Sequence, residues 1–167
     1  MNTRIDVEFK ILRPVLRNYG LPQYATVGSA GMDLCACVDQ PVTLQPGATH
    51  FFPAGFALHM KNTGLAAMIL SRSGLGTKKG LVVKQGVGLI DSDYQGEITV
   101  AIHNIGSESQ TIQPGDRIAQ LVVLPVFQPA LKEVSEFAEL TERGAGGFGS
   151  TGLKAPQTSV SQPTLSS

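Results

Sequence analysis

The chain has 167 residues, a length typical of one domain with its own core, and 42% of them are hydrophobic. Lysine plus arginine equals aspartate plus glutamate at 13 each, so the formal net charge is zero. This balance argues against a broad surface for nucleic acid or membranes and leaves room for a local anion site. The sequence shows no leader-like start and no apolar run of about 18 residues, so we expect a soluble, cytoplasmic protein.

The first elements are a strand, a loop and a second strand. Residues 7–11 alternate apolar and polar side chains, which predicts an opening strand. Residues 16–24 contain Asn-Tyr-Gly and Leu-Pro and are expected to form a loop. Small residues at 28–31 then lead into a strand that carries Asp33. A structural role for this carboxylate would be capping of loop amides or pairing with a nearby arginine.

Two cysteines, Cys35 and Cys37, stand two residues apart in this strand and should point to the same face. With no further cysteine and no nearby histidine they do not make a zinc site. We expect packed free thiols. The three histidines, His50, His59 and His103, are scattered and match no metal-binding spacing.

The rest of the chain contains two segments with the sequence of a type II turn. Pro46-Gly47 and Pro114-Gly115 fit the centre of a type II turn. Turn signals recur every ~8–12 residues, which predicts an all-β sandwich or barrel. The apolar runs between and after these turns lie at residues 51–60, 65–70, 81–83, 98–102 and 118–124.

Helical periodicity is nearly absent, so we expect at most one short helix, near residues 73–80. Ser73 would be its N-cap and Gly80 its C-cap. Free N–H groups at such a helix start, together with a hydroxyl and the Arg72 guanidinium, could cradle an anion. Lys78 and Lys79 are expected to face water.

Residues 86–97 have glycines near both ends and a strand-like run that stops at Asp91. Alternation resumes at Ile98, so the segment is either a β-hairpin or a strand-turn-strand corner. A rigid strand could present the Asp91 carboxylate to a cleft, with the amphipathic ring of Tyr94 nearby. The alternative is a surface turn whose aspartates only bind the backbone.

The C-terminal part changes character. Residues 131–140 are expected to be a last ordered segment, and residues 143–152 hold five glycines. This arm is either a linker or a segment that closes on something, because Phe148 left in water loses roughly 1.5–3 kcal/mol of burial energy. The tail from Leu153 is expected to be disordered. The predicted division is therefore a barrel over 1–140, an arm over 141–152 and a tail over 153–167.

Five segments of the sequence together resemble the five motifs of homotrimeric deoxyuridine triphosphate nucleotidohydrolases (dUTPases), in family order. They are residues 30–34, 72–76, 88–96, 114–121 and 143–152. The resemblance implies a distorted jelly-roll β-barrel and a homotrimer with active sites between subunits. It also implies hydrolysis of dUTP to dUMP and pyrophosphate with Mg²⁺, which limits uracil in DNA and supplies dUMP for thymidylate synthesis.

The resemblance gives Asp91 the role of orienting and deprotonating the water that attacks the α-phosphorus. A carboxylate on a rigid corner is suited to that role. Arg72, Ser73 and Gly74 would hold the phosphates together with Gln120. Asp33 would support the metal's water shell or the phosphate-site arginine. Magnesium commonly binds through substrate phosphates, so no protein ligand is assigned.

The same resemblance implies how the nucleoside is recognised. The backbone around Leu89 and Ile90, with Gln85 as a further candidate, would read uracil. Tyr94 would pack on the deoxyribose and leave no room for a 2′-hydroxyl, and Thr99 is a candidate by position. The arm would add further contacts to uracil and the phosphates, from residues Arg143, Phe148, Gly149, Ser150 and Thr151.

Two positions depart from the common family pattern: Ser71 where proline is frequent, and Gln85 where many members have asparagine. Asp116 and Arg117 are interpreted as a turn and an inter-subunit or local pair. Other classes remain open: a deoxycytidine triphosphate deaminase on the same fold, a non-enzymatic regulatory protein on the same barrel, or an unrelated β-barrel.

Overall fold

The computed structural model describes residues 5–146, and residues 1–4 and 147–167 lie outside the described part. The chain divides into two compact units, residues 1–129 and 130–167. All strands and helices found in residues 5–146 belong to the first unit, because the last strand ends at Pro125. The functional division into barrel, arm and tail remains a prediction.

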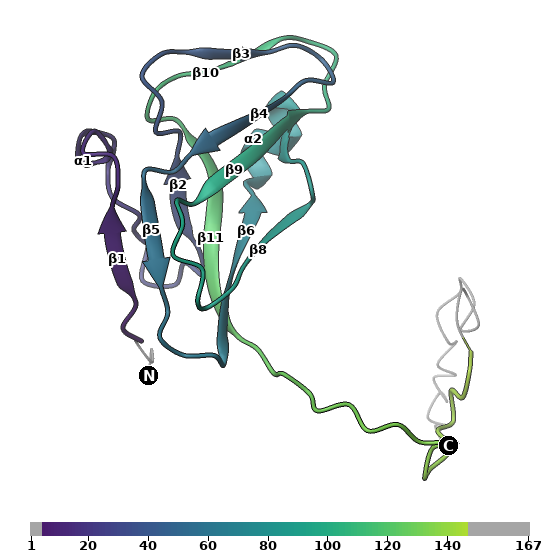
Figure 1. Ribbon diagram of the computed structural model, residues 1–167. Coiled ribbons are helices and arrows are strands. Elements are labelled where there is room, and N and C mark those ends of the chain that lie inside the picture. Colours follow the sequence, from purple (N-terminus) through teal and green to yellow (C-terminus); the bar gives the residue numbers. More distant parts are fainter. Residues whose placement is uncertain (1–4, 147–167) are drawn as a thin grey trace, which may run out of the picture. The chain divides into compact units, whose positions relative to one another are not determined.

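Four antiparallel sheets build the first unit (Figure 1). The largest has the order β2-β11-β6-β8, and its long strand β11 pairs with β2 on one side and β6 on the other. Its strands are β2 (Met32–Cys35), β11 (Arg117–Pro125), β6 (Leu65–Ser71) and β8 (Val87–Ile90). The second sheet is formed by β4 (Thr49–Pro53), β9 (Thr99–Asn104) and β7 (Leu81–Val83). Two-stranded sheets pair β1 (Glu8–Ile11) with β5 (Phe56–His59), and β3 (Val42–Leu44) with β10 (Gln110–Ile112).

The core lies between these sheets and explains why the strands form where they do. Apolar side chains from every sheet pack into one cluster. Each fully buried Leu, Ile or Phe contributes about 1.5–3 kcal/mol relative to exposure. The largest buried side chains include Leu34, Phe52, Phe56, Ile69, Ile98, Ile102, Ile118 and Leu121. The strands that carry the predicted site residues are therefore anchored by burial.

Both predicted type II turns are confirmed. Gly47 has φ 76° and Gly115 has φ 82°. The backbone N–H of Ala48 donates to the Gln45 carbonyl at 2.9 Å, and that of Asp116 donates to the Gln113 carbonyl at 3.1 Å. These bonds close each turn from its fourth residue to its first, and the positive φ at the third position explains the glycines.

Helix α2 (Ser73–Lys79) confirms the one predicted helix, and Gly80 caps it with φ 65°. The prediction of Ser73 as N-cap was wrong, because the cap position belongs to Arg72, whose backbone is extended. The limit of one helix was also wrong. A single turn, α1 (Leu16–Tyr19), forms where a loop was expected, since its Leu16 side chain is 1% exposed and held in the core. Four residues are too few to leave a periodic pattern.

Residues 91–98 form a corner between two sheets. Strand β8 pairs with β6, whereas β9 pairs with β4 and β7. Of the two alternatives left by the sequence, the strand-turn-strand corner is confirmed and the β-hairpin was wrong. The physical reason is that alternation gives a strand its faces but does not choose its partner.

In the second unit, residues 131–140 form neither a helix nor a strand. Leu131, Phe137 and Leu140 are at least 84% exposed. Among residues 5–146, none of the helices is long and apolar enough to cross a membrane.

Candidate active site

A cleft of about 610 Å³ opens where β6 ends and α2 begins. We call it the Arg72 cleft. It brings together residues from three of the five motif-like segments, among them Arg117, which had been interpreted as structural. The residues used below are Asp33, Arg72, Ser73, Gly74, Arg117 and Gln120, with Lys78 and Lys79 at the helix end.

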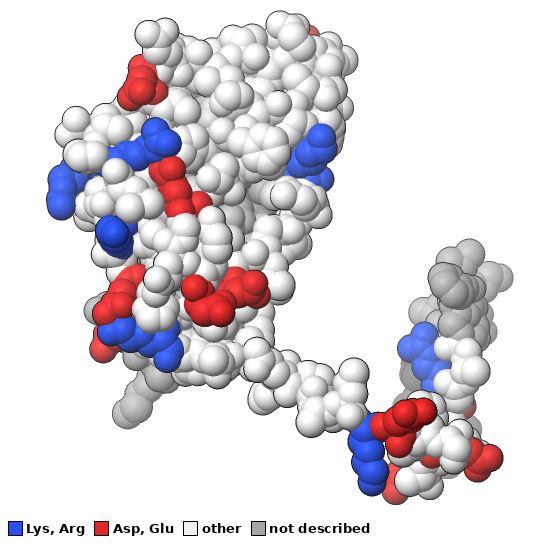
Figure 2. All heavy atoms as spheres, viewed as in Figure 1, with Lys and Arg blue, Asp and Glu red and all other residues white. Residues whose placement is uncertain are grey.

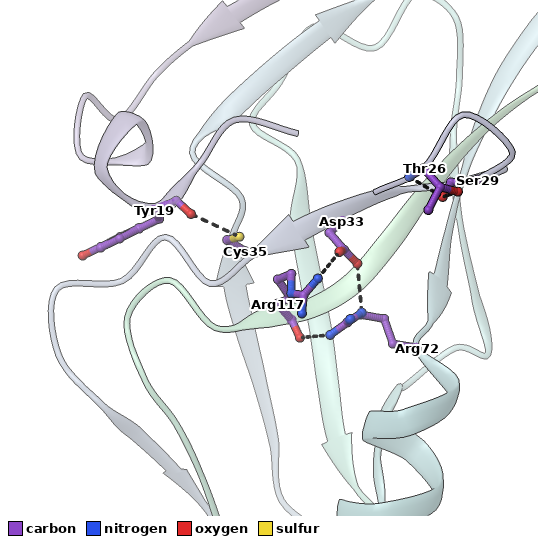
Figure 3. Close-up of polar contacts among 7 residues, drawn as sticks. All are labelled: Tyr19, Thr26, Ser29, Asp33, Cys35, Arg72 and Arg117. Atoms are coloured by element: carbon purple, nitrogen blue, oxygen red, sulfur yellow. Dashed lines mark hydrogen bonds and ion pairs between the residues drawn. The ribbon is translucent and has the colours of Figure 1, made fainter. Parts of the chain in front are cut away.

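Asp33 binds two arginines at this cleft (Figure 3). Arg72 Nε lies 2.9 Å from Asp33 Oδ1, and Arg117 Nη1 lies 2.9 Å from Asp33 Oδ2. Arg72 Nη1 also donates to the Arg117 carbonyl at 3.0 Å. Pairing of Asp33 with a nearby arginine is therefore confirmed. One carboxylate between two guanidinium groups leaves the cluster with a net positive charge, which suits an anion.

The start of α2 adds main-chain donors to the cleft. The N–H groups of Leu75 and Gly76 both donate to the Arg72 carbonyl, at 3.1 and 3.0 Å. The N–H groups of Ser73 and Gly74 precede this first helical bond, so the helix itself offers them no acceptor. Both residues are exposed and line the cleft. Lys78 and Lys79 are exposed, as expected, and they too line the cleft.

Gln120 reaches the cleft from β11. Its Nε2 donates to the Ser71 carbonyl at 3.1 Å. A Cβ at position 31 would lie 3.0 Å from Gln120 Oε1, so glycine there lets the amide approach. The Ser71 hydroxyl accepts the N–H of Val83 at 2.8 Å. Ser71 thus joins β6 to β7, a role that sequence reasoning missed because its partner lies twelve residues away.

A second group of predicted site residues lies at the corner after β8. Asp91 is exposed, and its carbonyl accepts the N–H of Tyr94 at 3.2 Å. Leu89 is 61% exposed, whereas Ile90 packs against the core. Gln85 is exposed in the turn before β8, and Thr99 opens β9 with its side chain exposed.

The two groups do not meet within one chain. Strands β6 and β8 run antiparallel with Ala67 opposite Ile90, and Arg72 follows the far end of β6. Five residues of extended strand separate Ala67 from Arg72, a distance of about 16 Å. That distance exceeds the length of a triphosphate group. Within one chain, the main chain at Asp91 therefore lies farther from Arg72 than a triphosphate group spans.

The predicted arm contacts fall in the second unit. Arg143 donates from Nε to the Gly146 carbonyl at 2.9 Å. The other four positions, Phe148, Gly149, Ser150 and Thr151, lie outside the described residues.

Both cysteines are buried free thiols, as predicted. Burial raises the pKa of the Cys35 and Cys37 thiols, which keeps them protonated and unreactive. Within residues 5–146, no group of three or more His, Cys, Asp or Glu side chains is placed to hold a metal ion. The donors of the Arg72 cleft are mainly cationic or N–H groups, which fit phosphate oxygens better than a bare Mg²⁺.

The turn residues Asp116 and Arg117 have the local roles expected of them. Asp116 Oδ2 accepts the N–H of Gln113 at 2.8 Å, and Arg117 pairs with Asp33. On the face of the barrel seen in Figure 2, acidic and basic side chains lie interspersed.

Comparison with known proteins decides the family. The family model described as dUTPase matches residues 17–152. The chain belongs to the dUTPase family. Together with the mainly β structure, this confirms the jelly-roll β-barrel expected from the sequence.

Relatives of this dUTPase-family chain match almost end to end. A deoxyuridine 5′-triphosphate nucleotidohydrolase of Ralstonia pickettii is 58% identical over 148 residues, covering 89% of this chain and 99% of the relative. The protein of that name from Aeromonas salmonicida is 55% identical, over 88% of this chain and 97% of its own. The solved structure of Staphylococcus bacteriophage 80alpha dUTPase with dUPNHPP has a TM-score of 0.78. It is 29% identical and covers 92% of this chain and all of that one.

Proposed function

We propose that this dUTPase-family chain hydrolyses dUTP to dUMP and pyrophosphate, and so limits uracil in DNA and supplies dUMP for thymidylate synthesis. The observation that carries the proposal is the Arg72 cleft, where two arginines, a carboxylate between them and helix-start N–H groups lie together and supply donors suited to phosphate. The relatives bearing the name of this activity match nearly the whole chain.

The chemical step is attack of a water oxygen on the α-phosphorus. A bond forms between that oxygen and phosphorus, and the bond from phosphorus to the oxygen bridging the α- and β-phosphates breaks. Pyrophosphate leaves with the bridging oxygen, and Asp91 orients the water and takes its proton. The exposed Asp91 carboxylate, at the end of the anchored strand β8, is suited to this role.

Arg72, Ser73, Gly74 and Gln120 bind the phosphates in this proposal. Negative charge grows on the leaving pyrophosphate, and donors fixed before the reaction stabilise it. Asp33 acts by orienting Arg72, since it holds Nε at 2.9 Å while Nη1 binds the Arg117 carbonyl at 3.0 Å, which leaves Nη2 for the ligand.

The corner after β8 recognises the nucleoside. Main-chain groups at Leu89 and Ile90 pair with the uracil edge, and Gln85 and Thr99 stand at either side of this strand and corner. Tyr94 packs on the deoxyribose and fills the space that a 2′-hydroxyl would need.

The active form is a homotrimer in which each site combines the corner of one chain with the Arg72 cleft of another. The separation of about 16 Å between these groups within one chain supports this assembly. The arm closes over the bound nucleotide, where Phe148 stacks on uracil. Arg143, Gly149, Ser150 and Thr151 contact the phosphates.

Magnesium would enter with the substrate through its phosphate oxygens and would supply neutralisation of part of their charge. Asp33, already shared by two arginines, is placed to contact the ion's water shell rather than the ion. A cytoplasmic location is part of the same proposal.

Asp91→Asn tests the assignment of the base. The amide keeps the shape of the side chain but cannot take the proton, so we expect unchanged assembly and dUTP binding with a loss of turnover greater than about 100-fold. Pyrophosphate release and isothermal calorimetry measure the two quantities. Asp93→Asn, an exposed aspartate on the same turn, is the matched control and should keep normal turnover.

Turnover of Asp91→Asn within about tenfold of the parent, roughly 1.4 kcal/mol in barrier, would remove Asp91 from the chemistry. The parent protein is also assayed with dCTP. Release of ammonia from dCTP without pyrophosphate from dUTP would replace the proposed function with deamination.

A further inference from the structure

The turn between β8 and β9 carries Asp91 and Tyr94, yet it contains no regular structure of its own. Main-chain bonds fix it near its two ends. The N–H of Met60 donates to the Ser92 carbonyl at 3.2 Å, and the N–H of Ile98 donates to the Phe56 carbonyl at 2.9 Å. Between these points the turn is tied to the barrel by the side chain of Glu97, and the geometry of that tie determines where Tyr94 lies.

Glu97 and Arg13 form a bidentate ion pair. Arg13 Nε lies 2.6 Å from Glu97 Oε1, and Nη2 lies 3.2 Å from Oε2. Two parallel bonds fix the orientation of both planar groups, which a single point contact does not. The hydrogen bond to Glu97 raises the pKa of Arg13, so the guanidinium stays protonated.

The arginine itself stands on a fixed backbone. The N–H groups of Leu12 and Arg13 both donate to the Gly55 carbonyl, at 2.9 and 3.0 Å. Gly55 has φ 84°, and a Cβ there would lie 2.6 Å from Cys37 Sγ. The carbonyl that holds Arg13 therefore belongs to a residue packed tightly against the core. Because its main chain is held in this way, Arg13 fixes the turn at residues 91–98 relative to the barrel.

Glu97 in turn holds Tyr94 through its main chain. Tyr94 Oη donates to the Glu97 carbonyl at 3.1 Å. The ring lies over Gly96, where a Cβ would come within 2.4 Å of the hydroxyl oxygen. The direction of the ring is thus set by Gly96 and by the Glu97 carbonyl, and the Glu97 side chain is held by the ion pair.

We propose that Arg13 and Glu97 are a positioning pair that sets the selection of deoxyribonucleotides by this enzyme. Arg13 acts through Glu97 on the Tyr94 ring and touches no substrate. The inference rests on the proposed function, because the ring is taken to fill the space of a 2′-hydroxyl. It adds two residues that lie outside the proposed binding set.

The test compares kcat/KM for dUTP and for UTP in the full chain and in Arg13→Met, which keeps length and removes the charge and the fork. Arg17→Met is the matched control, since Arg17 is an exposed arginine four residues on, in α1. We expect the dUTP/UTP ratio to fall roughly two- to tenfold in Arg13→Met and to stay unchanged in Arg17→Met.

Two further variants separate positioning from stability. Glu97→Gln keeps the shape of the side chain and should lower the ratio to a similar extent. The charge swap, Arg13→Glu combined with Glu97→Arg, restores the pair and should recover most of the ratio. Thermal midpoints are measured for every variant at one protein concentration.

An active parent whose dUTP/UTP ratio is the same in Arg13→Met and Glu97→Gln would overturn the inference and leave the proposed function intact. A lowered ratio that the charge swap fails to recover, and that follows the loss of thermal stability, would also overturn it. A parent without dUTP hydrolysis would instead refute the proposed function.

Discussion

At the residue scale, the side chains of the candidate site are placed by main-chain groups as much as by one another. Tyr94 illustrates this, because its hydroxyl binds the Glu97 carbonyl and its ring requires the missing Cβ of Gly96. Ser71 illustrates it as well, since its hydroxyl satisfies the N–H of Val83. Roles of this kind depend on which backbone atoms come near, and a motif does not encode them.

Tyr94→Ala should relax selection against UTP. Removing the ring opens the space that a 2′-hydroxyl needs, so we expect the dUTP/UTP ratio of kcat/KM to fall by at least about tenfold, or 1.4 kcal/mol. Tyr94→Phe is the control, because it keeps the ring and should retain most of the selection. An equal ratio in Tyr94→Ala and the parent would exclude the ring from sugar recognition.

At the element scale, α2 keeps its place through its C-terminal glycine. Gly80 has φ 65°, and its N–H donates to the Gly76 carbonyl at 3.0 Å. A Cβ at this position would lie 2.7 Å from the backbone nitrogen of Gly106, so the helix end packs directly on the loop after β9. The position of α2, and with it the Arg72 cleft, depends on this contact.

Gly80→Ala should therefore cost more stability than Gly47→Ala. Both glycines have positive φ, but a Cβ at Gly47 meets nothing within 4 Å. We expect about 1–2 kcal/mol of backbone strain for each substitution, and a further ~1–3 kcal/mol from the backbone clash at Gly80 alone. Urea unfolding at one fixed protein concentration measures the difference. If both variants lose the same free energy of unfolding, the loop after β9 moves aside without cost and the predicted clash is wrong.

At the scale of the whole molecule, one strand separates the two halves of the proposed site. Strand β6 carries Arg72 just past one end and pairs near its other end with Ile90, the neighbour of Asp91. This separation is fixed, because β6 is paired on both sides within the largest sheet. In the proposed function, a second copy of the chain therefore supplies the other half of each site.

Mixing two inactive variants tests this requirement. Asp91→Asn and Arg72→Met are each expected to lose most turnover. If they are unfolded together and refolded at equal amounts, about a quarter of the sites should combine an intact Asp91 with an intact Arg72. Recovered turnover should approach that fraction of the parent value. The same variants refolded separately and then mixed are the control. Turnover no higher in the co-refolded sample than in this control would show that the sites are not shared between chains.

The sequence by itself determined the strand-rich fold class, the two Pro-Gly turns, the buried thiols and the five motif segments that point to dUTP hydrolysis. These features are local, or they depend on residue types whose preferences are strong. The Pro-Gly turns need only the fixed φ of proline and the free φ of glycine. The same strength of local preference located the helix that Gly80 caps.

Only the tertiary structure decided which strands pair and which distant residues contact each other. Alternation along residues 86–102 is equally consistent with a hairpin and with a corner, and long-range pairing of β8 with β6 selected the corner. The turn α1 exists because Leu16 is buried in the core. The link from Arg13 to Glu97 joins residues 84 positions apart. Contacts of this range arise from packing of whole sheets, so no local pattern records them.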